Sequence, residues 1–99
     1  MAKGHLEQDI QTSIMNFIYS IGGLPIKQTQ IGIYGQAGVP DILSCIKGRF
    51  VAIEVKVPGE TPKPHQIAFL EAVIKCGGVS MWVDNLDNVK EVLKKENLL

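Results

Sequence analysis

The chain has 99 residues, of which 45% are hydrophobic, and its ten basic and ten acidic residues give a formal net charge of zero. This length predicts one domain with a thin stability margin, which a homodimer would relieve. Zero net charge excludes a general attraction to nucleic acid, so any such binding needs a local patch or bound metal ions. The sequence has neither an apolar run of the ~20 residues that span a bilayer nor a signal peptide, so we expect a cytoplasmic protein with no membrane partner.

Residues 5–21 predict an amphipathic helix that ends at the glycine pair 22–23. Its apolar stripe consists of Leu6, Ile10, Ile14, Phe17, Ile18 and Ile21. At about 100° per residue, Glu7 falls within that stripe, whereas Asp9 lies outside it. Glu7 is therefore either an acid on the buried face or an acid of a frayed first turn that favours the positive helix end. The pattern leaves both interpretations open.

Three strands are predicted next. Residues 25–34 indicate the first strand, and the apolar run 41–46 indicates the second. Lys47-Gly48-Arg49 reads as a tight turn, after which residues 50–57 form a return strand. The second and third strands therefore make a hairpin.

The open end of this hairpin gathers charged side chains. Asp41 begins the first arm and comes beside Glu54, and strand alternation places Lys56 on the same face as Glu54, about 7 Å away. Charges beside an apolar core must be compensated, and a divalent cation is the natural compensation. Mg²⁺ prefers oxygen ligands, which two carboxylates and the Val55 carbonyl supply. The alternative interpretation is a solvent-facing pair of Glu54 and Lys56, with Asp41 as a turn residue.

A proline-rich segment, 58–64, leads into a helix that ends at Gly77 and Gly78. Gln66 heads the apolar face of this helix, which continues through Phe69, Leu70 and Val73. The alternative for Gln66 is a glutamine at a helix start whose side chain is satisfied by water or backbone. Cys45 and Cys76 are predicted to be small buried hydrophobes in a reducing compartment.

The remaining chain predicts a short strand over 79–83 and a last helix capped by Asp84 or Asn85. The apolar positions of this helix are Leu86, Val89, Val92 and Leu93. The resulting order, α-β-β-β-α-β-α, predicts an α/β fold with a small mixed sheet flanked by helices, all in a single domain over 1–99.

Three sequence segments together resemble a known family. They are Gly38-Val39-Pro40-Asp41, then Phe50-Val51-Ala52-Ile53-Glu54-Val55-Lys56, then Gln66 ahead of Phe69-Leu70. Their combination is similar to the PD-(D/E)xK nucleases, and in particular to the stand-alone form of the VRR-NUC (virus-type replication-repair nuclease) branch. The resemblance implies a restriction-endonuclease-like fold and hydrolysis of DNA phosphodiester bonds with Mg²⁺ or Mn²⁺. His65 precedes Gln66 where a small residue is more usual, and we expect it at the surface.

The resemblance also implies a role for each matching residue. Asp41 and Glu54 match the metal carboxylates, and the Val55 carbonyl is a further ligand. Lys56 matches the catalytic lysine, which orients the attacking water or stabilises charge in the transition state. Glu7 matches a glutamate that completes or supports the metal site, and Gln66 matches an active-site glutamine. Candidates for contacts with DNA phosphates near the site are Lys27, Lys47, Arg49 and Lys63, although each one singly is more simply a solvated surface charge.

Stand-alone members resemble Holliday junction resolvases, so the resemblance implies a homodimer that cuts four-way DNA junctions. It would act at the nucleoid, or in the host-cell cytoplasm if phage-encoded. The alternatives are a flap or end nuclease of the same family and a DNA-binding module without catalysis. A hydrolase of small phosphoesters is weaker, because the sequence carries no recognisable nucleoside-pocket motif.

Overall fold

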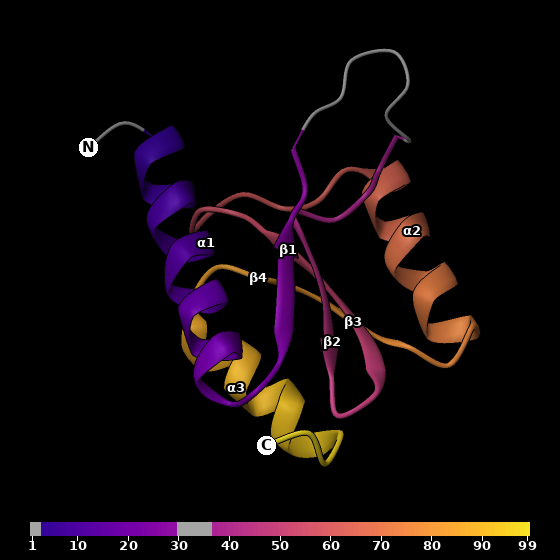
Figure 1. Ribbon diagram of the computed structural model, residues 1–99. Coiled ribbons are helices and arrows are strands. Elements are labelled where there is room, and N and C mark those ends of the chain that lie inside the picture. Colours follow the sequence, from indigo (N-terminus) through magenta and orange to yellow (C-terminus); the bar gives the residue numbers. More distant parts are fainter. Residues whose placement is uncertain (1–2, 30–36) are drawn as a thin grey trace.

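The computed structural model describes residues 3–29 and 37–99, which form helices and strands in the expected order α-β-β-β-α-β-α (Figure 1). The elements are α1 (Lys3–Ser20), β1 (Leu24–Lys27), β2 (Ile42–Ile46), β3 (Arg49–Val55), α2 (Pro64–Lys75), β4 (Val79–Val83) and α3 (Leu86–Lys95). The predicted α/β class is confirmed.

The ends of several elements differ from the expected ranges. α1 ends at Ser20 because Gly22 adopts a left-handed conformation with φ 85°, and the N–H of Gly23 then bonds to the carbonyl of Ile18 at 2.9 Å. β1 ends at Lys27, and most of the rest of the expected strand, residues 30–34, lies outside the described residues. β3 ends at Val55, two residues before the predicted end of its strand.

The strands form one mixed sheet in the order β1-β2-β3-β4. β1 pairs with β2 and β2 with β3 in antiparallel fashion, whereas β3 and β4 run parallel and α2 makes the crossover between them. The tight turn between β2 and β3 has positive φ at both central positions, 50° at Lys47 and 80° at Gly48. Positive φ at both positions is typical of the two-residue turns that join tightly twisted hairpins. The hairpin is confirmed.

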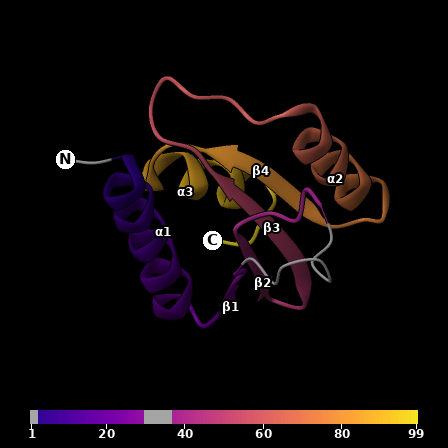
Figure 2. The ribbon, with the colours of Figure 1, turned by 90° about the horizontal axis from the view of Figure 1, so that it is seen from above.

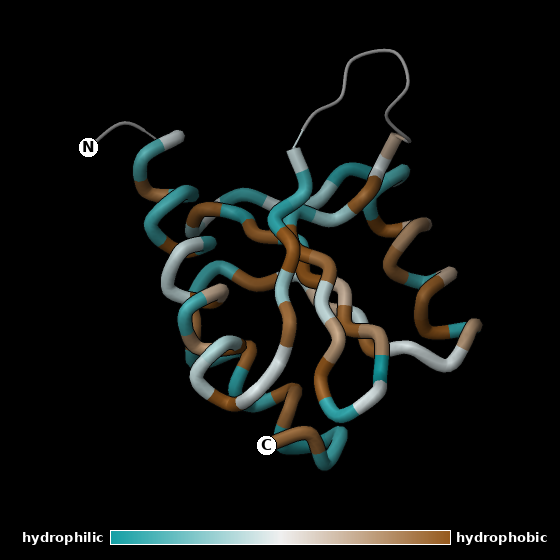
Figure 3. Tube along the Cα trace, viewed as in Figure 1, coloured by the Kyte–Doolittle hydropathy of each residue, from teal (hydrophilic) through white to brown (hydrophobic). Residues whose placement is uncertain are grey.

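The helices cover the two faces of the sheet unequally. Figure 2 shows α1 and α3 on one side of the sheet and α2 on the other, beside β3 and β4. The main core lies under α1 and α3, where Ile14, Ile18, Val89 and Leu93 pack against the inward residues of the strands. Figure 3 shows hydrophobic residues concentrated along these central strands. None of the described helices is long and apolar enough to cross a bilayer.

Two details of the helices refine the expectations. Asn85, and not Asp84, caps α3, since its side-chain oxygen accepts the N–H of Asn88 at 2.9 Å. Leu6, expected in the apolar stripe of α1, is 38% exposed. The buried part of that stripe begins one turn later, with partly buried Ile10 and fully buried Ile14.

The prediction that both cysteines are buried is wrong, because Cys45 and Cys76 are exposed. Cys45 alternates away from the core onto the second face of the sheet, in register with Leu24 and Phe50, which are also exposed. Cys76 is the residue that ends α2 and lies beyond its last buried turn. Apolar character along a strand could not show which of its faces lacks a covering helix.

Candidate active site

The open end of the β2–β3 hairpin brings Asp41 and Glu54 into direct contact. The pairing of Ile42 with Ile53 places the residue before β2 opposite the end of β3. The backbone N–H of Asp41 donates to Oε1 of Glu54 at 3.2 Å. In the reverse direction, the N–H of Val55 donates to Oδ2 of Asp41 at 2.8 Å. These reciprocal bonds fix both carboxylates. They use one oxygen of each, so Oδ1 of Asp41 and Oε2 of Glu54 take no part in them.

Asp41 is held from two other directions. Its carbonyl accepts the N–H of Gln28 at 2.7 Å, which ties it to the end of β1. The loop before it packs against α2, because a Cβ added at Gly38 would lie 2.6 Å from the carbonyl oxygen of His65. Gly38 also has φ 83°, a conformation that side chains rarely adopt. The glycine therefore allows the close approach that sets the path of the chain into Asp41.

The Glu54 carboxylate is buried and electrostatically perturbed. It is 2% exposed, and its burial raises its pKa to about 7, with the charge of Asp41 acting in the same direction. Lys56 opposes this increase, since its Nζ lies 3.5 Å from Oε2 of Glu54. A buried carboxylate beside a second one favours either a proton or a cation. The predicted contact of these three residues is confirmed, and the alternative of a solvent-facing pair is wrong.

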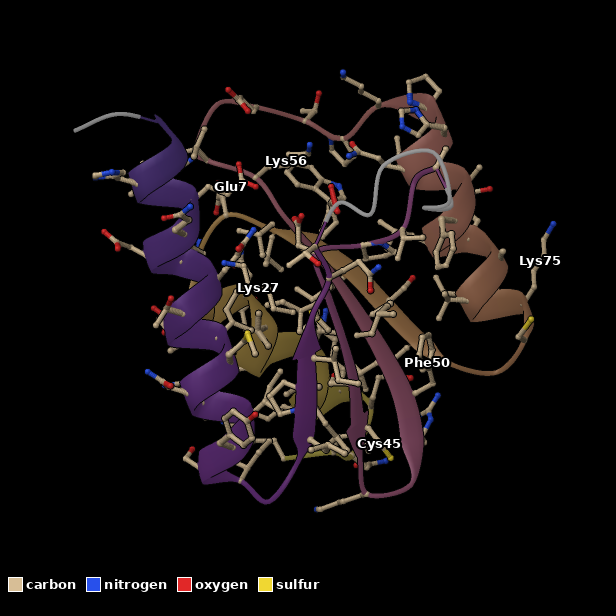
Figure 4. All side chains as sticks on the ribbon, turned by 45° about the horizontal axis from the view of Figure 1, so that its top comes forward. Glu7, Lys27, Cys45, Phe50, Lys56 and Lys75 are labelled. Atoms are coloured by element: carbon tan, nitrogen blue, oxygen red, sulfur yellow. The ribbon has the colours of Figure 1, made fainter. Side chains whose placement is uncertain are left out.

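Glu7 reaches the same region from α1. Figure 4 shows Glu7 near Lys56, where the first turns of α1 meet the chain that leaves β3. Partial burial raises the pKa of Glu7, the charge of Asp41 raises it further and Lys56 lowers it. The side-chain amide of Gln11 donates to Oε1 of Glu7 at 3.3 Å. Glu7 is half-buried. Its placement supports the interpretation of Glu7 as an acid on the inner face of α1, directed toward the site.

Two residues near Glu7 were missed by the sequence reasoning. Gln11 is only 6% exposed and orients Glu7 from one helical turn away, a spacing that the sequence does show. Glu60 raises the pKa of Glu7 through its charge. Glu60 belongs to the proline-rich segment, and only the tertiary path of that segment brings it close.

Gln66 makes a local bond at the start of α2. Its Oε1 accepts the backbone N–H of Lys63 at 2.8 Å, so its side chain closes the first turn of its own helix. This is the backbone-satisfied alternative considered from the sequence. Its side chain is half-buried, and its role in catalysis stays a prediction. His65 is exposed, as expected.

The four candidate DNA contacts divide into two groups. Lys27 ends β1 and lies near enough to Glu7 to lower its pKa, while Lys63 directly precedes α2. The expectation that Lys47 and Arg49 lie near the site is wrong. Both are at the closed end of the hairpin, roughly 15 Å from its open end at ~3.3 Å per residue.

Arg49 has partners of its own at the closed end of the hairpin. Its guanidinium pairs with Glu96 at 3.2 Å and donates to the carbonyl of Gly77 at 3.3 Å. These contacts join the start of β3 to the ends of α2 and α3. Arg49 therefore has a structural role in this fold.

The donor atoms at the hairpin end fit a hard divalent cation. Within 3–29 and 37–99, no three His, Cys, Asp or Glu side chains converge closely enough to hold a metal by themselves. Asp41 and Glu54 nevertheless supply two carboxylates, and the Val55 carbonyl is a further oxygen between Glu54 and Lys56 along the chain. Mg²⁺ usually binds through one or two carboxylates, with water and substrate phosphate completing its shell. Burial raises the pKa of Glu54 to about 7, with the charge of Asp41 acting in the same direction, so a bound cation would stabilise the charged form of this carboxylate.

Known proteins resemble the chain both in sequence and in structure. No protein-family model matches it. A curated protein described as "Putative nuclease p44", from Acyrthosiphon pisum secondary endosymbiont phage 1, is 34% identical over 82 residues, which cover 82% of this chain and 85% of that protein. A solved structure described as "VRR_NUC domain" matches 90% of this chain and 95% of its own, with a TM-score of 0.74 and 26% identity. A second, "VRR_NUC domain protein", has a TM-score of 0.69 at 23% identity over 89% of this chain and 84% of its own, a likeness of fold alone.

Proposed function

Because the chain belongs to the VRR-NUC family of nucleases, we propose that it is a metal-dependent endodeoxyribonuclease that cuts branched DNA, with the four-way junction as its preferred substrate. The observation that carries the chemistry is the contact of the half-buried Asp41 with the buried carboxylate of Glu54, with Lys56 Nζ 3.5 Å from Glu54. DNA supplies a polyanionic substrate, so the phosphate itself must be accommodated beside two acids. A cation held between the acids and the phosphate resolves that conflict.

Each residue of the hairpin end takes a defined part in this proposal. Asp41, Glu54 and the Val55 carbonyl would hold Mg²⁺ or Mn²⁺, which polarises the scissile phosphate and lowers the pKa of a bound water. The reciprocal hydrogen bonds between the two strands hold the carboxylates in place before substrate arrives. Lys56, already paired with Glu54, would place its ammonium group beside the scissile phosphate and stabilise charge in the transition state.

Residues on the two flanking helices would support this centre. Glu7 would bind or orient a water of the metal shell from α1, held by Gln11. Gln66 would act from the start of α2. Lys27 and Lys63 are the candidates on this side of the molecule for contacts with the phosphate backbone.

The preference for junctions rests on the family and on symmetry. Two copies related by a two-fold axis would present two such sites to opposing strands of a two-fold symmetric junction. A nuclease for flaps or ends would use the same centre on a different DNA shape. The same assay separates these alternatives.

The test compares labelled four-way junctions, flaps and linear duplexes with Mg²⁺, with Mn²⁺ and with EDTA. We expect junction cleavage with either ion and none with EDTA. Asp41→Asn and Lys56→Met should lower the cleavage rate at least about 100-fold, as is typical for loss of a group that stabilises transition-state charge. Lys47→Met, at the closed end of the hairpin, is the matched control and should cut at the wild-type rate.

Three results would contradict the proposal. Cleavage by Asp41→Asn or Lys56→Met at the wild-type rate would remove these residues from the mechanism. Tight binding of junctions without cleavage under any divalent ion would favour a DNA-binding module. Faster cleavage of flaps or ends than of junctions would show that the preferred substrate is a flap or an end, while the proposed cleavage chemistry would stand.

A further inference from the structure

A half-exposed tryptophan lies beside the candidate active site, on the strand next to Glu54. β4 pairs with β3 in parallel, and Trp82 is in register with Glu54. Neighbouring strands lie about 4.8 Å apart, and residues in register point to the same face of a sheet. The indole ring and the buried carboxylate therefore leave the sheet side by side. Trp82 is 43% exposed, and it is the one tryptophan of the chain.

Packing against α2 covers only part of Trp82. α2 lies on the same face of the sheet, beside β3 and β4 (Figure 2). The hydroxyl of Ser80 donates to the carbonyl of Leu70 in this helix at 2.7 Å. The helix thus contacts β4 one step back along this face, yet it leaves nearly half of Trp82 open. At up to roughly 250 Å² for a tryptophan, this exposure corresponds to roughly 100 Å² of aromatic surface next to the site.

The backbone holds the ring and the site in one frame. The N–H of Lys56 donates to the carbonyl of Val83 at 2.9 Å, which continues the contact of β3 with β4 past Glu54 and Trp82. Nζ of Lys56 in turn lies 3.5 Å from Oε2 of Glu54. Side chains carried by paired strands keep their relative positions better than side chains on loops. The ring therefore lies at a fixed place relative to the groups proposed to act on the scissile phosphate.

The chemistry of the ring favours a nucleobase among the parts of DNA. Indole is uncharged and has one N–H donor, so it offers little to a phosphate. Every base, in contrast, has a flat face that stacks on an aromatic side chain. The bases of a continuous duplex are covered by their neighbours, so only a base displaced from the stack can meet a protein ring. Flaps and open ends supply such bases directly, and a branch point interrupts the continuous stack.

We propose that Trp82 is a stacking platform for a nucleobase adjacent to the scissile phosphate, and that it directs cleavage toward DNA with an unstacked base beside the cut. Successive phosphates of one strand are about 3.4 Å apart along the helix axis, so a ring about 4.8 Å from Glu54 across the sheet suits the neighbouring nucleotide. The inference rests on the proposed function, which supplies the DNA and the place of the phosphate. It adds a residue that distinguishes branched from continuous DNA.

The first test uses the fluorescence of Trp82 itself, because no other tryptophan contributes. Asp41→Asn is titrated without metal, so that the DNA stays intact, with a four-way junction, a flap and a blunt duplex. A stacked base quenches indole emission. At saturating DNA we expect strong quenching by the junction and the flap and much weaker quenching by the duplex. This measurement needs no cleavage, so it can be interpreted whether or not the chain is a nuclease.

The second test separates stacking from apolar packing. Trp82→Phe keeps a flat ring, whereas Trp82→Leu keeps apolar bulk without one, and circular dichroism checks that both are folded. Trp82→Leu should lower kcat/KM on junctions roughly 5- to 150-fold, the range for one lost base stack, and Trp82→Phe should retain most of the activity. An abasic nucleotide next to the mapped cut should slow wild type by a similar factor and Trp82→Leu no further.

Phe50→Leu is the matched control for the loss of an exposed ring. Phe50 is 46% exposed and lies on the same face of the sheet, four residues before Glu54 on β3. At ~3.3 Å per residue, it lies roughly 13 Å from Glu54. Phe50→Leu should therefore cut junctions at the wild-type rate.

Two results would overturn the inference. Emission that stays unchanged while the junction binds would show that no base reaches Trp82. Equal kcat/KM in Trp82→Leu, Trp82→Phe and wild type would show that the ring serves packing or a protein contact instead. A wild type that cuts no DNA, although the junction quenches Trp82, would refute the proposed nuclease function and leave the contact with a base standing.

Discussion

The buried carboxylate of Glu54 makes the stability of this chain depend on pH, and Glu54→Gln removes that dependence. Burial raises the pKa of Glu54 from 4.5 to about 7, with Asp41 adding to the increase and Lys56 opposing it. Glutamine has nearly the same shape and keeps an oxygen for the N–H of Asp41, which bonds to Glu54 at 3.2 Å. The substitution therefore isolates the charge.

The direction in which stability changes with pH follows from proton binding to Glu54. The folded chain holds a proton on Glu54 over a pH range in which the unfolded chain has lost it. The contribution to stability is fully present below pH 4.5 and is lost as pH rises through about 7. At about 1.4 kcal/mol per pH unit, the whole effect is about 3 kcal/mol. Between pH 5 and pH 8 the expected loss in free energy of unfolding is about 2 to 3 kcal/mol.

The assay is urea unfolding at pH 5 and pH 8 in the presence of EDTA. Wild type should lose about 2 to 3 kcal/mol more than Glu54→Gln between these pH values. Glu7, whose pKa is also raised, acts in the same direction in both proteins, so the difference reports Glu54. Glu71→Gln, at an exposed acid of α2, should follow wild type. Mg²⁺ at pH 8 should stabilise wild type and leave Glu54→Gln unchanged, because a cation stabilises only a site that binds it.

Equal pH dependence of the free energy of unfolding in wild type and Glu54→Gln would contradict this prediction. It would mean that the carboxylate is solvated or neutralised in the folded chain without cost, and the electrostatic case for a cation at the hairpin end would fail with it.

Three further predictions concern the surroundings of the site. Gly38→Ala should lower the free energy of unfolding by about 2 kcal/mol or more, because its φ is 83° and a Cβ would lie 2.6 Å from a carbonyl oxygen of α2; a thermal melt unchanged from wild type would contradict this. Gln66→Leu should cost about 1 kcal/mol by losing the acceptor for the N–H of Lys63, whereas Gln66→Glu should keep it. Equal losses in both variants by urea unfolding would exclude the cap. Lys27→Gln should weaken junction binding and lower the slope of log affinity against log salt concentration by the equivalent of about one phosphate contact. Lys47→Gln should match wild type in the same filter-binding titration.

Local sequence patterns were sufficient for the element order and for the centre of the site. Apolar alternation and a tight turn define the β2–β3 hairpin, and the hairpin alone dictates that Asp41 meets Glu54. Lys56 follows from the same alternation. These contacts are set by residues about a dozen positions apart, joined by one turn, so few alternatives exist.

The partners of other residues depended on packing between distant elements. Arg49 looked like a phosphate contact, yet it pairs with Glu96 at the end of the chain. Gln66 faces its own helix start, and Cys45 is exposed because α2 covers only part of one sheet face. No local sequence pattern shows how much of a sheet face a packed helix covers.

The fold class, the hairpin and the acids and lysine at its open end thus follow from local sequence, because strand alternation and turn geometry are local properties. Packing between distant elements was needed to show that Glu54 is buried enough to raise its pKa, that α1 brings Glu7 near that end, and that Leu24, Ile26 and Phe50 are exposed. Burial and exposure are set by which elements pack together, and that arrangement is a property of the whole chain.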